Sequence, residues 1–203
     1  DFRINQSVNG GGWQYQHSFP ADATLDNQDV WTIITDQTDV ALFDPANADE
    51  VLSYPSVVHH NGDDARALEW TPDGGATWII LDLIGDPDND PGDGWDVAGE
   101  VAATKNHTLV RKSDITVGTT DWAASAGTSA DDSQWIVYPE DTFSYLGSHN
   151  IPTDGTISGT ITLDGGAGTI TDVVITAGTQ TTNPAADGTY QISIAAGTYS
   201  VTA

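Results

Sequence analysis

Residues 65–85 read ARALEWTPDGGATWIILDLIG, two runs of apolar and β-branched side chains on either side of a turn. Strand-forming residues such as Trp70 and Ile79 flank the segment TPDGGA, in which Pro72 and the Gly74–Gly75 pair are typical of a tight turn. This pattern predicts an antiparallel β-hairpin over these residues.

Short runs of the same kind stand on both sides of this hairpin. In residues 11–20, Trp13, Tyr15 and His17 alternate with glutamines, which is the period-two pattern of a strand. A single turn of helix is predicted within residues 120–132, beginning at the N-cap residue Asp121. Further strands are predicted at residues 29–36, 51–60, 107–118, 131–139 and 141–147.

The composition favours the same fold class. Of 30 acidic residues, 26 are Asp and 4 are Glu, and the chain also holds 26 Thr and 21 Gly. Asp favours turns and helix caps, whereas Glu favours helices and Thr favours strands. The sequence therefore predicts an all-β fold in which strands are joined by tight acidic turns.

The charge balance restricts the expected partners. With 5 Lys plus Arg against 30 Asp plus Glu, the formal net charge is -25. Nucleic acids and anionic membrane surfaces are bound mainly through Lys and Arg, so no nucleic acid partner is expected. Direct membrane insertion is not expected either, because no run of about 18 apolar residues is present. Cations are the expected counter-partners, and the acidic surface also suits a high-salt environment.

Cysteine is absent, which excludes disulfides and thiolate metal sites. An extracellular protein without disulfides needs another means of fixing its loops, and bound calcium is one candidate. The chain starts at Asp1 and holds no Met, which indicates a processed product or a piece of a longer protein.

A change in composition predicts two domains. From Pro152 onward the chain has no Trp, His, Phe, Lys or Arg, whereas Thr, Gly and Ile become frequent. We therefore expect a first domain over residues 1–150, a linker over 151–155, and a second, smaller β-sandwich over 156–203. Four strands are predicted in the second domain, at residues 156–163, 169–179, 189–197 and 198–203. Because the pattern stops in mid-strand, this sandwich is expected to be truncated.

Alternation also predicts which side chains of the second domain share a face. Ile157, Ile161 and Leu163 are expected on one face of the first strand. The later strand is expected to place Tyr190, Ile192 and Ile194 together in the same way.

Several segments resemble known families. The stretch GDPDNDPGDGWDVAG of residues 85–99, with its Gly94–Trp95–Asp96 end, and the run HTLVR of residues 107–111 are similar to a bacterial lamin-tail domain. The resemblance covers residues 1–149 and implies an immunoglobulin-like β-sandwich of secreted and surface proteins. In that family one or two strands precede the segment matched here, so the resemblance leads us to expect that the chain starts after them. Residues 154–203 resemble the start of a carboxypeptidase regulatory-like domain, which has a transthyretin-like fold.

The acidic loop offers a candidate metal site. Asp86, Asp88 and Asp90 stand at alternate positions, followed by Asp93 and Asp96, and alternate carboxylates of a turning loop can point at one calcium ion. The loop is not an EF-hand, because that motif needs Gly where Pro91 stands and Glu where Val97 stands. The alternative is a hydrated turn on an acidic surface, and the sequence leaves both open.

Two other groups of residues are candidates for binding. His59, His60, Asp63 and Asp64 offer transition-metal ligands, but adjacent histidines in a strand point to opposite faces. Trp13 and Tyr15 lie in a Gly-rich stretch and could stack on carbohydrate, although Trp in small sandwiches is more often core packing.

No nucleophile elbow of the form GxSxG is present, so catalysis is not expected. The two families that the chain resembles are themselves non-catalytic. We therefore expect a structural or adhesive module of a secreted or cell-surface protein, stabilised by calcium and in contact with other subunits or the rest of a longer chain. Two alternatives stay open. One is a subunit of an extracellular filament that assembles by strand exchange, and the other is an accessory domain of a secreted nuclease or protease.

Overall fold

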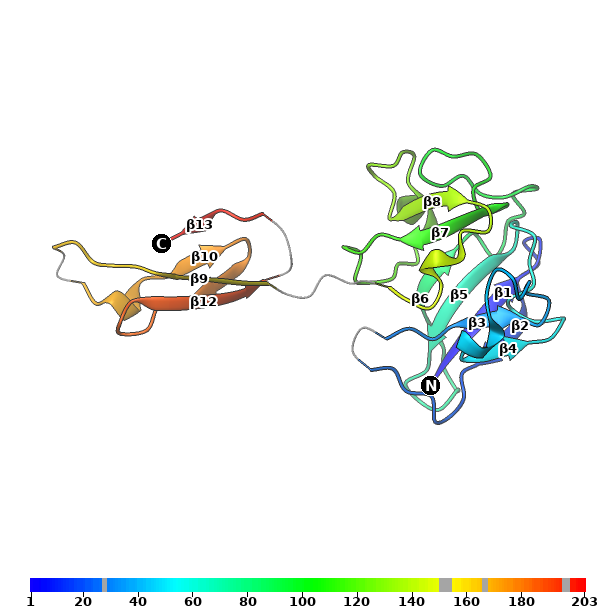
Figure 1. Cartoon of the computed structure of the whole chain (residues 1–203), viewed down its shortest axis with the longest axis horizontal. Coiled ribbons are helices and arrows are strands. Elements are labelled where there is room, and N and C mark those ends of the chain that lie inside the picture. Colours follow the sequence, from blue (N-terminus) through cyan, green and yellow to red (C-terminus); the bar gives the residue numbers. More distant parts are fainter. Residues whose placement is uncertain (27–28, 150–154, 166–167, 195–197) are drawn as a thin grey trace. The chain divides into compact units, whose positions relative to one another are not determined.

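The computed structural model describes residues 1–26, 29–149, 155–165, 168–194 and 198–203, and it is an all-β sandwich fold, as the composition predicts (Figure 1). The chain divides into two compact units, Asp1–Ile151 and Pro152–Ala203. Of the expected linker at residues 151–155, residues 151–154 lie outside the described residues, and Gly155 already belongs to a strand.

The first unit is organised around the predicted hairpin. Its arms, β5 and β6, pair antiparallel, and the turn between them holds Gly74 and Gly75 at positive φ. They form one side of a four-stranded sheet of order β2-β1-β5-β6. Smaller pairs are the parallel β3–β4 and the antiparallel β7–β8. The strands of this unit are β1 (Phe2–Ser7), β2 (Trp13–Ser18), β3 (Ile33–Thr35), β4 (Glu50–Leu52), β5 (Ala65–Trp70), β6 (Ile79–Ile84), β7 (His107–Arg111) and β8 (Trp135–Pro139).

Strand β1 has no counterpart among the sequence predictions, yet it lies at the centre of this sheet (Figure 1). It pairs with β2 on one side and with β5 on the other. Its residues Asn5, Gln6 and Ser7 are polar but fully buried. A run of buried polar residues gives no apolar alternation, and this is why the pattern did not predict the strand.

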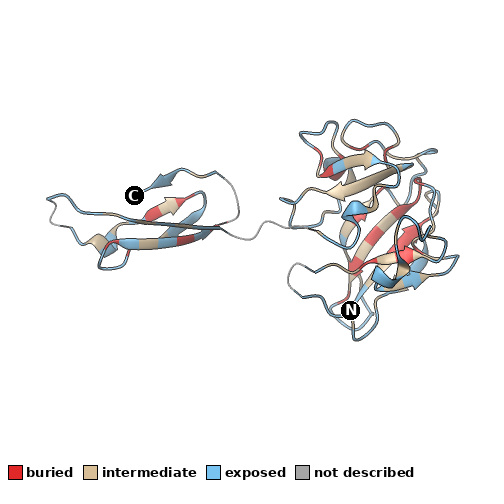
Figure 2. Cartoon of the chain, in the orientation of Figure 1, coloured by how far each residue is buried: buried red, intermediate tan, exposed pale blue. Residues whose placement is uncertain are grey.

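A cluster of buried apolar side chains lies beneath β7 and β8. Val97, Ala103, Ala126 and Trp135 are buried there, and Ile84 from the end of β6 packs against them. Buried residues gather on β1 and β5 as well (Figure 2). The Trp135 indole N–H donates to Ser125 Oγ at 2.9 Å, which satisfies a polar group inside the core.

The predicted turn of helix is confirmed. Helix α1 spans Trp122–Ala126, and Asp121 caps it by accepting from the N–H of Ala124 at 3.0 Å. A carboxylate at this position satisfies one of the backbone donors that the first turn leaves without a partner.

The predicted strands at 29–36 and 107–118 are shorter than expected, since β3 and β7 cover only part of them, and two others fail more completely. In residues 51–60, β4 ends at Leu52 because Pro55 follows, which has no N–H to continue a ladder, and His59 N–H then closes a turn by donating to Ser56 O at 3.0 Å. In residues 141–147 the segment Phe143–Tyr145 is a 3-10 helix, η2, preceded by Asp141 at a positive φ of 59°. Another 3-10 helix, η1, spans Pro45–Asn47.

The second unit is a small sandwich with its own core. Ile175 and Ala177 of one sheet and Ile192 and Ile194 of the other are buried against each other. Ile157, Ile161 and Tyr190 pack on this cluster as the alternation predicts, whereas Leu163 lies beyond the strand and is exposed. The elements are β9 (Gly155–Thr160), η3 (Ile170–Asp172), β10 (Ile175–Ala177), β11 (Gln180–Thr182), β12 (Thr189–Ile194) and β13 (Val201–Thr202).

The pairing of this unit differs from the predicted four strands. Strands β9 and β12 form one sheet, and β11-β10-β13 form the other. The predicted strand at 169–179 is divided into η3 and β10, and β11 was not predicted.

Candidate functional site

The acidic loop of residues 85–96 follows β6, and all five of its aspartates are exposed. Asp86 Oδ1 accepts from the N–H of Asp88 at 3.0 Å, and Asp90 Oδ1 accepts from the N–H of Gly92 at 2.7 Å. These are Asx turns, in which a carboxylate closes the backbone two residues further on. The first half of the loop is therefore shaped by its own side chains.

Two further predicted ligands, Asp93 and Asp96, have partners outside the first half of the loop. Asp93 forms an ion pair with Lys105, and Asp96 Oδ1 accepts from the N–H of Ala102 at 2.9 Å. Within the part of the chain that the structure describes, no group of three or more His, Asp or Glu side chains is placed to hold a metal ion. The five loop aspartates are thus not brought together, and the calcium site stays a prediction.

Trp95 fixes the far end of this loop. Its ring packs so closely on Gly85 that an added Cβ there would lie 2.6 Å from the ring. The Trp95 ring also makes an edge contact with the Trp122 ring, with centroids 6.5 Å apart. The backbone N–H of Trp95 donates to Thr104 Oγ1 at 2.8 Å. The Gly94–Trp95–Asp96 motif is therefore an anchor for the loop.

The residues of the HHNGDD segment take separate roles. His59 Nδ1 lies 2.8 Å from Ser56 Oγ, and its Nε2 lies 2.7 Å from Thr35 Oγ1. Asp64 Oδ2 accepts from Gln6 Nε2 at 2.7 Å. Asp63 instead accepts from Asn61 Nδ2 at 3.1 Å. The structure does not bring His59, His60, Asp63 and Asp64 together as metal ligands.

Ser56, His59 and Asp36 have the residue types of a catalytic triad but not its geometry. In a triad the acid binds the imidazole nitrogen opposite the nucleophile. Here the Thr35 hydroxyl occupies that nitrogen, and Asp36 Oδ1 lies 3.9 Å away. The contacts orient the His59 ring between two hydroxyls. The absence of catalysis remains a prediction.

A pocket of about 540 Å³ lies beside this histidine. Tyr15, one of the two aromatic residues predicted to bind carbohydrate, lines it, whereas Trp13 on the same strand does not and is half-buried. Sequence reasoning missed the other important lining residues. They are Gln6, Gln37, Tyr54 and Asn61, which come from β1 and from segments without regular secondary structure.

A neighbouring pocket of about 590 Å³ is more apolar and holds one cationic group. Arg66 Nε donates to Val57 O at 3.0 Å and Nη1 donates to Asp64 O at 3.3 Å, while Nη2 is buried without a partner. Burial lowers the pKa of Arg66 to about 10, partly offset by the Asp64 charge, so the guanidinium stays charged at neutral pH.

His60 lines both of these pockets. Burial first, then the charges of Arg66 and His59, lower the pKa of His60 from 6.5 to about 3. A shift of that size belongs to a fully enclosed ring, whereas the surface of His60 is exposed. Solvent around the exposed residue therefore screens part of this effect. We therefore expect the ring to titrate between about 3 and 6.5 and to be neutral at pH 7.

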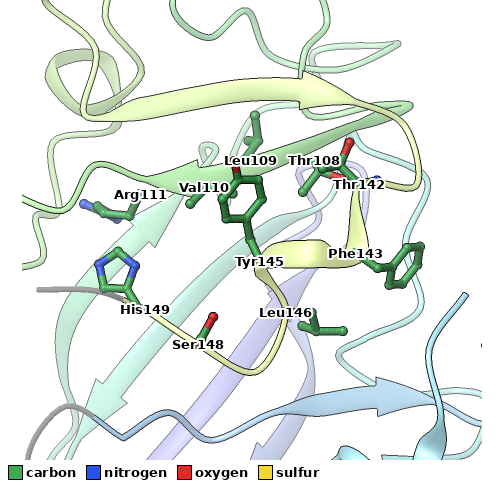
Figure 3. A pocket seen from close by; sticks show the side chains of 10 residues that line it. All are labelled: Thr108, Leu109, Val110, Arg111, Thr142, Phe143, Tyr145, Leu146, Ser148 and His149. Carbon is green, nitrogen blue, oxygen red and sulfur yellow. Dashed lines mark hydrogen bonds between the residues drawn. The ribbon is translucent and has the colours of Figure 1, made fainter.

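A third pocket, of about 300 Å³, lies between β7 and the segment around η2 (Figure 3). Tyr145 stands in it and stacks on Tyr138 with centroids 4.6 Å apart, while Phe143 points away from the other labelled side chains. Its one arginine, Arg111, is already paired with Asp82 at 2.6 Å. This pocket offers no free charged group from β7 to a ligand.

A comparison with known protein families, with curated proteins and with solved structures found no match. The resemblance to lamin-tail and carboxypeptidase regulatory-like domains therefore stays a prediction. Among the described residues, no helix combines the length and the apolar character needed to cross a membrane.

Proposed function

We propose that this chain is a non-catalytic structural or adhesive module of a secreted or cell-surface protein. The observation that carries the proposal is that many acidic side chains accept hydrogen bonds from the backbone of their own loops and so fix the shape of those loops. Asp132 accepts four hydrogen bonds from Thr128 and Ser129, and these lower its pKa to about 2. Carboxylates that accept backbone N–H groups in the same local manner are those of Asp39, Asp44, Asp86, Asp90, Asp96, Asp121 and Asp187.

A reaction centre needs side chains whose donors and acceptors are free to meet a substrate. The carboxylates named above instead form hydrogen bonds within the loops that they close. This arrangement suits a protein that presents a fixed surface. Rigid loops on a β-sandwich are a common way to hold binding residues in place. The proposed lamin-tail resemblance favours the same kind of role.

Surface binding and turnover can be tested on the purified chain. We expect beads coated with the chain to be retained on cell envelopes or on immobilised polysaccharide. We expect no hydrolysis of ester, phosphodiester or peptide substrates. Turnover that co-purifies with the chain and is lost in Ser56→Ala or His59→Gln would overturn the non-catalytic proposal.

Calcium stabilisation belongs to this proposal but has its own test. Asp86 and Asp90 accept backbone N–H groups in the present geometry, so calcium would have to compete with these turns. We expect calorimetry at physiological ionic strength to detect calcium binding that Asp88→Asn weakens. If no binding is detected and a chelator leaves Tm unchanged, the metal prediction fails while the module proposal stands.

Unprotected sheet edges favour a second candidate function, a filament subunit that pairs strands between copies. Within the described residues, β2 pairs as a strand only with β1, and β9 only with β12, although the His17 side chain of β2 also contacts Glu50 of β4 at 3.0 Å. Neither β2 (WQYQHS) nor β9 (GTISGT) carries a Lys, a Glu or a Pro, the residues that usually guard an edge.

Sedimentation at micromolar concentration tests this second candidate. We expect oligomers whose population rises with salt, because salt screens the net charge of -25 between copies. Gln16→Lys on β2 or Ser158→Lys on β9 should reduce them, since both residues are exposed. A monomer at all salt concentrations, with both units fully protected from hydrogen exchange, would exclude strand exchange.

A further inference from the structure

The pocket beside His59 combines exposed aromatic rings with polar side chains. Its volume is about 540 Å³, in the range of small-molecule sites. Tyr54 is 70% exposed and Tyr15 is 36% exposed, and both line it. The Tyr54 ring is held by an edge contact with the His59 ring, with centroids 5.2 Å apart and an interplanar angle of 89°. Two large rings are therefore presented to solvent at the same pocket.

Exposed tyrosines of this kind suit a ligand that is apolar on one face and polar on the other. A tyrosine ring offers an apolar face and a polar tip with little conformational entropy to lose. The C–H face of a pyranose ring stacks on such a surface, while its hydroxyl groups point toward polar neighbours.

The floor of the pocket is polar, and amide groups stand at its rim. Gln6 is 1% exposed, and its Nε2 donates both to His59 O at 2.8 Å and to Asp64 Oδ2 at 2.7 Å. Because both partners are acceptors, the amide has only one orientation that satisfies them. Gln6 Oε1 is fully buried, so Gln6 does not meet the ligand itself, and its two hydrogen bonds instead hold the His59 backbone and Asp64 in place beneath the pocket. Gln37 and Asn61 add amide groups at the rim.

The charges around the pocket disfavour an anionic ligand. The Asp64 carboxylate stands next to the Arg66 guanidinium, whose pKa it raises, so the two charges compensate one another. Asp36, with its side chain 43% exposed, lies near His59, and the whole chain carries -25. Anionic ligands would be repelled by this field. Amide groups and hydroxyls with little net charge match the hydroxyl groups of a neutral sugar.

We propose that this pocket, between Tyr15, Tyr54 and the Asn61 amide, binds a neutral saccharide. The proposal rests on the adhesive function proposed above and names the chemical class of its ligand. One sugar ring lies against Tyr54 and Tyr15, and its hydroxyl groups exchange hydrogen bonds with the amides of Gln37 and Asn61 at the rim.

The test uses the whole chain and neutral oligosaccharides as probes. Cellohexaose, maltohexaose, mannohexaose and chitohexaose are titrated into the labelled protein, and backbone and tyrosine resonances are followed by NMR. We expect at least one probe to shift the resonances of Tyr15, Tyr54 and Asn61. Tyr54→Ala should weaken that binding about tenfold, the effect of losing one stacked aromatic ring. Gln37→Ala should weaken it by a smaller factor.

A matched control separates this pocket from exposed tyrosine in general. Tyr145 is 41% exposed but lines the pocket at β7, so Tyr145→Ala should leave saccharide binding unchanged. Tyr54 and Gln37 lie outside the core, and circular dichroism will show that both variants fold. The proposal is overturned if no probe binds, or if binding survives Tyr54→Ala. Retention of the Tyr54→Ala chain on cell envelopes would then leave the adhesive function standing with a different ligand site.

Discussion

Ser125 carries a buried hydrogen bond that a single substitution removes. Its Oγ accepts from the indole N–H of Trp135 at 2.9 Å, and both residues are buried. Ser125→Ala leaves that N–H without a partner, so we expect the free energy of unfolding to fall by about 1–3 kcal/mol. Urea denaturation measures this, with the exposed Ser113→Ala as control. If both variants lose the same small amount of unfolding free energy, the Trp135 indole N–H has found another acceptor.

His60 makes stability depend on pH in a defined direction. Its pKa is lowered in the folded chain, so below pH 6.5 the unfolded chain takes up a proton that the folded chain does not. The free energy of unfolding should therefore be highest above pH 6.5 and fall as the pH drops toward the folded pKa. We expect His60→Gln to flatten this slope between pH 6.5 and about 4.5, above the range in which carboxylates titrate. Parallel slopes in the two proteins would contradict the assignment.

The acidic loop behaves as one element because Trp95 closes it. Gly85 and Gly92 both have positive φ, 79° and 85°, but only Gly85 faces the Trp95 ring, whereas a Cβ at Gly92 meets nothing within 4 Å. Gly92→Ala should cost about 1–2 kcal/mol from backbone strain alone. Gly85→Ala should cost about 1–3 kcal/mol more, because the ring must move. Thermal unfolding followed by near-UV circular dichroism compares the two variants. Equal losses of stability would mean that the Trp95 ring moves aside at no cost.

The elements that the sequence predicted correctly are those whose apolar residues alternate around a clear turn. The hairpin of β5 and β6 and the cap at Asp121 are examples, because turn and cap chemistry is local. Strand β1 was missed because Asn5, Gln6 and Ser7 are polar and buried. Their burial follows from pairing on both sides, which no local pattern reports.

The candidate site was only partly predictable for the same reason. Tyr15 was named in advance, but Tyr54 and Gln6 meet it through tertiary contacts between β2, β1 and an irregular segment. The acidic spacing suggested one metal ion, whereas the backbone of the loop satisfies Asp86 and Asp90 first. The spacing of aspartates in the sequence does not reveal which carboxylates already accept hydrogen bonds from the loop backbone.

At the scale of the whole chain, the two units have separate cores. Ile175 is fully buried in the second unit and Val97 is fully buried in the first. The substitution Ile175→Ala removes buried methyl groups and should lower the free energy of unfolding by about 2–5 kcal/mol. This is a large share of the stability of a small domain. We expect calorimetry of Ile175→Ala to show a change in the unfolding transition of the second unit only. Val97→Ala should change only the transition of the first unit. A single transition that both variants lower together would show that the units unfold as one.

The net charge of -25 should also govern the stability of the whole molecule. Unscreened like charges oppose the compact state, and raising the salt from 0.1 to 1 M shortens the screening length from about 10 to about 3 Å. We therefore expect Tm to rise with sodium chloride. Neutralising three exposed aspartates, Asp88→Asn, Asp114→Asn and Asp131→Asn, should raise Tm at low salt and reduce the gain from added salt. None of the three carboxylates accepts a hydrogen bond from the described residues, so the variant changes charge without removing a loop contact. Differential scanning calorimetry of both proteins across this salt range measures the effect, and a variant Tm that is unchanged or lower at low salt would contradict the role of repulsion.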